Sequence, residues 1–153
     1  MSREEPLRQR LLAGEQALLA AVAGLEDEMA ATTSANPGWA IKDVLAHLAS
    51  AELGHCAVIR RLLAGESTHL PGFDLDAFNE AEVAARRRLS LAEVLAEYQA
   101  NRAVTLALLT TIGPEDWDKA GPHPGGFETT VEGVFRVIAL HEKRHLREMK
   151  AAT

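Results

Sequence analysis

The sequence predicts an all-α fold, a four-helix bundle in which a long crossover joins the second and third helices. Three observations support this prediction. Ala and Leu, both strong helix formers, are abundant, whereas aromatic residues make up only 5% of the 153 residues. Four long segments repeat apolar residues every three or four positions. No strand-length segment alternates convincingly between apolar and polar residues.

The first long helix is expected from about Glu5 to Ala31. Its apolar residues recur at intervals of 7, 4, 3 and 4 positions, which predicts a seam that packs against other helices. The residues of this seam are Leu11, Leu18, Val22, Leu25 and Met29. Turn-forming residues at positions 32–38 end the helix.

The second long helix is expected from about Trp39 to Ala64. Gly65 follows as a natural C-terminal cap, because glycine readily adopts the left-handed conformation that often ends a helix. The residues of the expected buried face are Ile41, Val44, Leu45, Leu48, Ile59, Leu62 and Leu63. The expected length of this helix is roughly 25 residues.

A capping box marks the start of the third long helix. Ser90 and Glu93 stand three positions apart, so each side chain can bond the backbone N–H of the other. Leu89 and Val94 occupy the positions of a hydrophobic staple around this start. The apolar stripe continues until Gly113–Pro114 ends the helix.

The fourth long helix is expected to begin with a second capping box, formed by Thr129 and Glu132. It reaches nearly to the C-terminus. The residues of its buried stripe are Val131, Val134, Phe135, Ile138 and Met149.

Two connections are longer than ordinary turns between helices. The segment 65–89 holds an expected short helix from about Asp76 to Arg88, and it is long enough to let the second and third helices run parallel. The segment 113–128, rich in Gly and Pro, is expected to be a loop that covers one end of the bundle. A single domain spanning residues 1–153 accommodates all these elements.

Composition and charge exclude several classes of function. The net charge is -6 and the basic residues are dispersed, so we expect no nucleic-acid partner. No apolar run approaches the roughly 20 residues that cross a bilayer, so we expect no membrane span. The single Cys56 excludes an intrachain disulfide, and the first residues do not resemble a signal peptide. These features predict a cytoplasmic protein.

His141 and His145 stand four positions apart on the fourth helix, within the same stripe as its apolar residues. Side chains with this spacing lie about one turn apart, close enough for two imidazoles to bind one ion. The pair alone is weak evidence, because short motifs of this kind often arise by chance. A metal site therefore needs a third ligand.

His47, at the edge of the apolar stripe of the second helix, is the best third ligand. It lies about 10 Å from the start of that helix, whereas His141 and His145 are centred about 12 Å from the end of the fourth. The three rings meet only if these two helices are antiparallel. The prediction of a metal site thus includes a prediction of topology.

Three neutral imidazoles suit Zn, Ni or Fe(II), and they leave positions open to water or substrate, as in catalytic sites. Glu142 and Glu52 are also expected to face inward, where each could accept a ring N–H from a ligand or act as general base. We therefore name both as candidate catalytic residues. Hydrogen-bonded core histidines without any metal are the alternative interpretation.

The other three histidines have no assigned role. His55 is expected to face inward, either as a boundary residue or as part of a pocket wall. His69 and His123 lie in the long connections, where exposure is the usual outcome, although His123 could overhang the site.

The segment 141–145 also matches HExxH, in which the Glu is the general base of a zinc protease. Only eight residues follow His145, which leaves no room for the usual downstream ligand. There is also no predicted strand that could hold an extended peptide beside the metal. We therefore disfavour a protease.

The order of these residues resembles that of the DinB/YfiT-like family of metal-binding four-helix-bundle proteins. Residues 39–49 are similar to the family's second helix, in which a Trp precedes a His. Residues 76–80 resemble the connecting segment of one branch, and residues 123–126, followed by a helix with HxxxH, resemble its C-terminal third. Related mycothiol-dependent isomerases have Glu at the position of His141, and Ala40 replaces the Ser or Thr that often caps the second helix.

The resemblance implies metal-dependent chemistry, because characterised relatives are transferases of low-molecular-weight thiols such as bacillithiol or mycothiol, or isomerases and hydrolases. Our first hypothesis is an enzyme that activates a small thiol or water for S-transfer or hydrolysis. The alternative is a stress-response or small-molecule-binding protein that keeps the fold and catalyses nothing. The apolar seam of the first helix favours a homodimer.

Four arginines could contact the carboxylates of a thiol cosubstrate. They are Arg60, Arg61, Arg102 and Arg136. For each of them, an exposed salt bridge is the simpler expectation.

Overall fold

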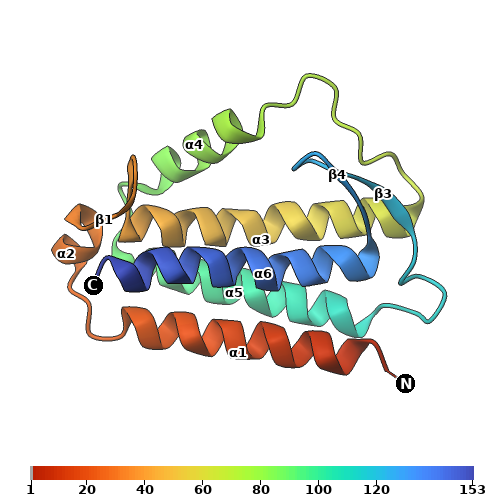
Figure 1. Cartoon of the computed structure of the whole chain (residues 1–153), viewed down its shortest axis with the longest axis horizontal. Coiled ribbons are helices and arrows are strands. Elements are labelled where there is room, and N and C mark those ends of the chain that lie inside the picture. Colours follow the sequence, from red (N-terminus) through yellow and green to blue (C-terminus); the bar gives the residue numbers. More distant parts are fainter. Residues whose placement is uncertain (1) are drawn as a thin grey trace.

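The computed structural model describes residues 2–153, about 67% of them helical, and confirms the predicted four-helix bundle (Figure 1). The four long helices are α1 (Glu4–Val22), α3 (Ile41–Ala64), α5 (Leu91–Thr110) and α6 (Val131–Ala151). Of the helices within residues 2–153, none is long and apolar enough to cross a membrane.

The crossover between α3 and α5 makes these two helices parallel, as the length of the connection predicts. The chain leaves α3, returns along the outside of the bundle through α4 (Leu75–Arg86), and enters α5 at the end where α3 began (Figure 1). Helix α6 runs opposite to α3. The antiparallel packing that the metal-site prediction required is therefore present.

The first predicted helix is wrong in one respect, because it is broken in two. Helix α1 ends at Val22, and a separate short helix, α2 (Asp27–Thr32), follows. Gly24 lies between them with a φ of 75°, in the left-handed region that interrupts a right-handed helix. Met29, an expected member of the buried seam, is consequently 53% exposed.

The predicted caps are confirmed at α3 and α5 and shifted by one residue at α6. Gly65 has a φ of 70° and ends α3. Ser90 and Glu93 form both bonds of the capping box of α5. At α6 the cap is Thr130, whose hydroxyl accepts from Gly133 N–H at 3.0 Å, so the predicted box starting at Thr129 is wrong.

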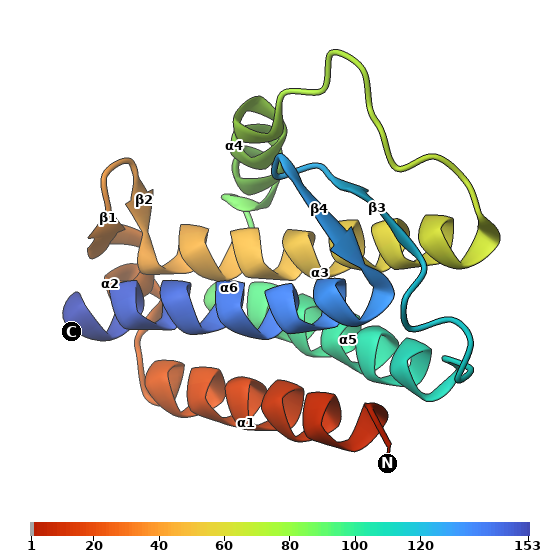
Figure 2. The same cartoon turned by 45° about the vertical axis from the view of Figure 1, so that its right-hand side comes forward.

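Two short antiparallel hairpins, which the sequence did not predict, lead into the helices that carry the histidines. The pair β1 (Ser34–Asn36) and β2 (Trp39–Ala40) precedes α3. The pair β3 (Ala120–His123) and β4 (Phe127–Thr130) precedes α6 and occupies much of the predicted loop. The β3–β4 hairpin and α4 lie over the same side of α3 and α6, opposite α1 (Figure 2).

A buried cluster of charged and hydroxyl side chains fastens α5 to α3 and α6. Arg102 on α5 is fully buried and donates from Nη2 to Glu52 Oε1 at 2.5 Å and to Glu142 Oε2 at 2.8 Å. Thr105 donates to the other oxygen of Glu52 at 2.5 Å, and the Tyr98 hydroxyl donates to Glu142. Each carboxylate is thus bound by the arginine and by a hydroxyl.

Helix α1 closes the remaining side of this cluster. Arg102 Nη1 donates to the backbone carbonyl of Leu11 at 2.7 Å. Gly14, about one turn later on α1, faces Glu142 so closely that a methyl group built there would overlap Oε1. A glycine is therefore required here by close approach, not by backbone conformation.

We predict that Gly14→Ala destabilises the protein. The added methyl displaces Glu142 from its partners, and overpacking of this kind costs roughly 1 to 3 kcal/mol. The free energy of unfolding in urea measures the effect.

Gly54→Ala on α3 is the matched control, because a methyl group there meets nothing within 4 Å. It should leave the protein unchanged or stabilise it by up to about 1 kcal/mol through helix propensity. If the two variants had equal stability, the close approach at Gly14 would be unimportant.

Candidate metal centre

The antiparallel packing of α3 and α6 brings three imidazoles together. His47 lies in the second turn of α3, and His141 and His145 lie one turn apart in the second half of α6. His47 and His145 are buried, and His141 is half-buried. Helical spacing thus places the two α6 rings beside one another, and the bundle topology supplies the third.

The Nε2 atoms of the three rings converge on one point. His141 Nε2 lies 3.0 Å from His47 Nε2 and 3.1 Å from His145 Nε2. A single ring nitrogen carries one proton or one lone pair, so it cannot form a good hydrogen bond with both neighbours. Hydrogen bonding among the rings therefore does not explain the arrangement.

A divalent ion does explain it. Nitrogens bound tetrahedrally to Zn at about 2.05 Å are separated by about 3.3 Å, close to the two separations seen here. The ligating atoms of the three side chains all lie within 4.8 Å of one another. The donor set fits a divalent transition metal of the kind that imidazole prefers.

Groups around the triad orient its rings. Glu148, one turn after His145, accepts from Nδ1 of that ring at 2.9 Å and also from Asn36 Nδ2 at 2.8 Å. A proton on Nδ1 leaves the Nε2 lone pair of His145 pointing at the centre, which is the arrangement common around metal-binding histidines. The Trp39 ring packs against His47 at 5.0 Å between centroids.

Burial favours the neutral, metal-binding form of His47 and His141. It is the main cause that lowers the pKa of His47 to about 4 and that of His141 to about 2, with the neighbouring histidines lowering both further. Nδ1 of His47 is buried without a hydrogen-bond partner. Such burial costs free energy, and binding an ion at Nε2 offsets that cost.

Glu142 and Glu52 face inward, as expected, but their partners are not imidazoles. Both carboxylates bond Arg102 in the core of the bundle. Burial raises the pKa of Glu142, and the positive charge of Arg102 opposes that shift. The hydrogen bond to a ligand imidazole that was expected of Glu142 or Glu52 is instead made by Glu148, which bonds His145. The catalytic role of Glu142 and Glu52 stays a prediction.

The remaining histidines divide into an exposed one and a pair. His69 is exposed, as expected. His123, on the hairpin, is half-buried with its Nε2 3.3 Å from His55 Nδ1, and the His55 ring lies 6.0 Å from that of His141. His123 therefore overhangs the same side of the bundle as the triad.

Sequence reasoning missed two residues that matter here. The expectation that Arg102 is exposed is wrong, because its side chain is fully buried, whereas the other three arginines are exposed as expected. Glu148 was not identified, although its position three residues after His145 on one helix face was a usable signal.

Comparison with known proteins agrees with the fold. The model of the DinB superfamily matches residues 10–149. A search of curated proteins found no match.

Among solved structures, the mycothiol-dependent maleylpyruvate isomerase is similar, with a TM-score of 0.84 and 15% identity over 97% of this chain and 61% of its own. This chain therefore spans less than two thirds of that isomerase. YfiT from Bacillus subtilis, described as a probable metal-dependent hydrolase with an unusual four-helix bundle topology, has a TM-score of 0.82 and 20% identity over 99% of this chain and 87% of its own. At such identities the likeness shows the fold alone.

We predict that Glu148→Gln weakens metal binding by about 10- to 100-fold, because the neutral amide holds the His145 ring less firmly. Titration with Zn²⁺ against a competing chelator measures the affinity.

Glu132→Gln is the control, since Glu132 lies on the same helix, is similarly exposed and pairs with arginines instead of a histidine. If the two variants bound Zn²⁺ with equal affinity, Glu148 would have no role in orienting the metal ligands.

Proposed function

The chain belongs to the DinB superfamily, and we propose that it is a metal-dependent enzyme whose ion is held by His47, His141 and His145. The observation that carries this proposal is the convergence of three Nε2 atoms that cannot satisfy one another by hydrogen bonds.

We propose S-transfer from a low-molecular-weight thiol, or hydrolysis, as the reaction class. A divalent ion held by three neutral ligands keeps a net charge of +2, and when bound it lowers the pKa of a thiol or water toward neutrality. The likeness to a mycothiol-dependent isomerase and to YfiT supports this choice of chemistry.

Side chains around the proposed metal centre hold its ligands in place. His145 is held by Glu148, which in turn is held by Asn36 on the β1–β2 hairpin. The half-buried His141 marks the side on which a small molecule would approach the centre. For Glu142 and Glu52 we favour a positioning role, because both pair with Arg102 and so fix α3 against α6.

The proposed ligands predict the metal content. Purified without a histidine tag, the wild-type protein should bind about one equivalent of Zn²⁺, Ni²⁺ or Fe²⁺, and His145→Ala should bind far less, because two remaining ligands hold an ion weakly. Elemental analysis after dialysis gives the stoichiometry.

His69→Ala is the matched control, because this histidine is exposed and outside the triad. It should keep the wild-type content. Retention of the ion in His145→Ala would contradict the assignment.

Glu142→Gln separates a positioning residue from a general base. If Glu142 positions α6, the neutral amide weakens the pairing with Arg102 and lowers the free energy of unfolding by about 1 to 3 kcal/mol. The kcat of the metal-saturated enzyme should then change little.

The assay is conjugation of a small thiol with 1-chloro-2,4-dinitrobenzene, in which sulfur displaces chloride and the thiol proton passes to solvent. A fall in kcat of about 100-fold with unchanged stability would identify a base instead. Wild-type activity that is indifferent to metal would count against the enzyme proposal as a whole.

A further inference from the structure

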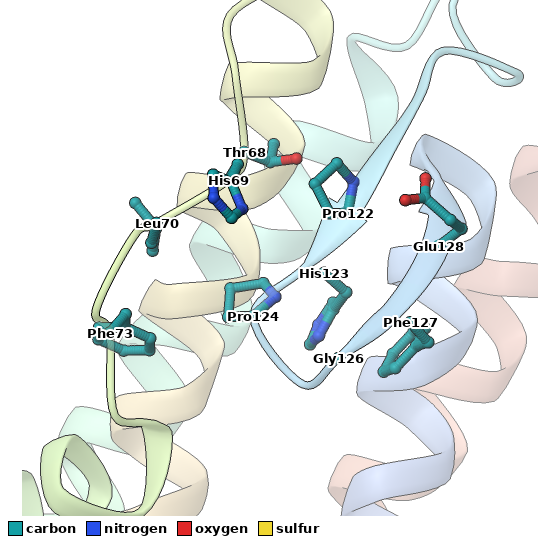
Figure 3. Close-up of a pocket in the computed structure, with 10 residues that line it drawn as sticks. All are labelled: Thr68, His69, Leu70, Phe73, Pro122, His123, Pro124, Gly126, Phe127 and Glu128. Atoms are coloured by element: carbon teal, nitrogen blue, oxygen red, sulfur yellow. The ribbon is translucent and has the colours of Figure 1, made fainter.

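A cavity of about 340 Å³ lies between the crossover and the β3–β4 hairpin (Figure 3). Residues 68–73 of the crossover form one wall, and residues 122–128 of the hairpin form the other. The two segments are far apart in the sequence. The cavity therefore exists only because both long connections fold over the same side of the bundle.

The walls combine apolar and aromatic side chains with polar ones, among them two histidines and Glu128. Leu70 and Phe73 on one wall and Phe127 on the other remain 39 to 43% exposed. Thr68 also lines the cavity, but its hydroxyl oxygen is buried and faces Gly121 of the hairpin. A concave surface on which aromatic side chains and polar groups converge is typical of small-molecule sites.

The formal charge of the cavity walls is negative. Among the residues that line the cavity, Glu128 is the only one with a formal charge at pH 7, and Figure 3 shows its carboxylate turned toward Pro122. An anionic ligand would be repelled here, whereas an uncharged or cationic one would not.

His123 joins the cavity to the metal centre. Its ring stacks on Phe127, with 4.4 Å between centroids and an angle of 12°. The N–H of Gly125 donates to His123 Nδ1 at 2.8 Å, so Nε2 carries the proton that is shared with His55 Nδ1. The His55 ring in turn lies 6.0 Å from that of His141. The rings of His123 and His55 therefore lie between the cavity and His141, a proposed metal ligand.

We propose that this cavity binds the aromatic part of the compound that reacts at the metal centre, and that it selects uncharged or cationic aromatics over anionic ones. The assignment of that compound as a substrate rests on the proposed function. The aromatic side chains and the lone Glu128 carboxylate together define the ligand class.

Fluorescence of N-phenyl-1-naphthylamine, an uncharged aromatic amine that brightens in apolar sites, tests the cavity itself. The titration is made on the metal-loaded chain and again after the ion is removed. Phe127→Ala should weaken binding by about tenfold through loss of the aromatic wall.

Met29→Ala is the control, because Met29 is 53% exposed, is a large apolar side chain like Phe127 and does not line the cavity. It should bind within about twofold of wild type. Equal affinities of the two variants, or no binding by the wild type, would overturn the site.

Displacement of the probe by three matched naphthalenes tests the charge selection. The compounds are 2-naphthylmethylamine, 2-naphthylmethanol and 2-naphthoate. The cationic amine should bind roughly three- to fivefold more tightly than the alcohol, the anion should bind most weakly, and Glu128→Gln should abolish the advantage of the amine. An order that ignores charge, or that Glu128→Gln leaves unaltered, would contradict the selection.

Proton relaxation of the bound probe tests the link to the metal. Protons of a compound in this cavity should relax faster in the Co²⁺-loaded chain than in the Zn²⁺-loaded chain, because Co²⁺ is paramagnetic. Identical relaxation would separate the cavity from the centre and overturn the proposal. A chain that binds no metal would defeat the proposed function, while the fluorescence titration would still decide whether the cavity is a site.

Discussion

Arg102 is shared by two carboxylates from different helices, and the position of the histidines depends on this sharing. A fully buried guanidinium is tolerated only where its charge is paired and its donors are satisfied, and here Glu52 on α3 and Glu142 on α6 supply both. Removing one partner from such a pair typically costs about 3 to 5 kcal/mol. The network therefore fixes α3 against α6, the two helices whose histidines must meet.

Helix α6 therefore carries the two histidines of the triad on one face and an ion-paired carboxylate on another. Glu142 follows His141 directly, so its side chain is turned by about 100° around the axis of α6. It reaches Arg102 and Tyr98, whereas His141 reaches His47. The HExxH pattern is therefore present in the sequence, but its Glu is occupied by an ion pair in the core. A motif match alone did not reveal which face each residue occupies.

Apart from the break at Gly24, the sequence was sufficient for the four long helices, their directions and the meeting of the three histidines, because apolar periodicity and capping residues are local signals. The sequence was insufficient where a structure depends on contacts between residues that are far apart along the chain. Leu91, Val94 and Tyr98 define a stripe whose continuation passes through Arg102 before Leu109, so the burial of Arg102 could have been read from spacing, but its partners lie on other helices. No alternation of apolar and polar residues predicts the pairing of β3 with β4.

The helices and the connections of this fold contribute different parts of the candidate site. The proposed ligands lie on helices that a buried ion network holds rigid, which suits an ion that requires a fixed donor geometry. The cavity walls come from the crossover and the hairpin, segments that tolerate change in sequence without loss of the core. Structures with only 15 and 20% identity to this chain share its fold. In such a scaffold, the connections can change in sequence while the helices that carry the three histidines keep their packing.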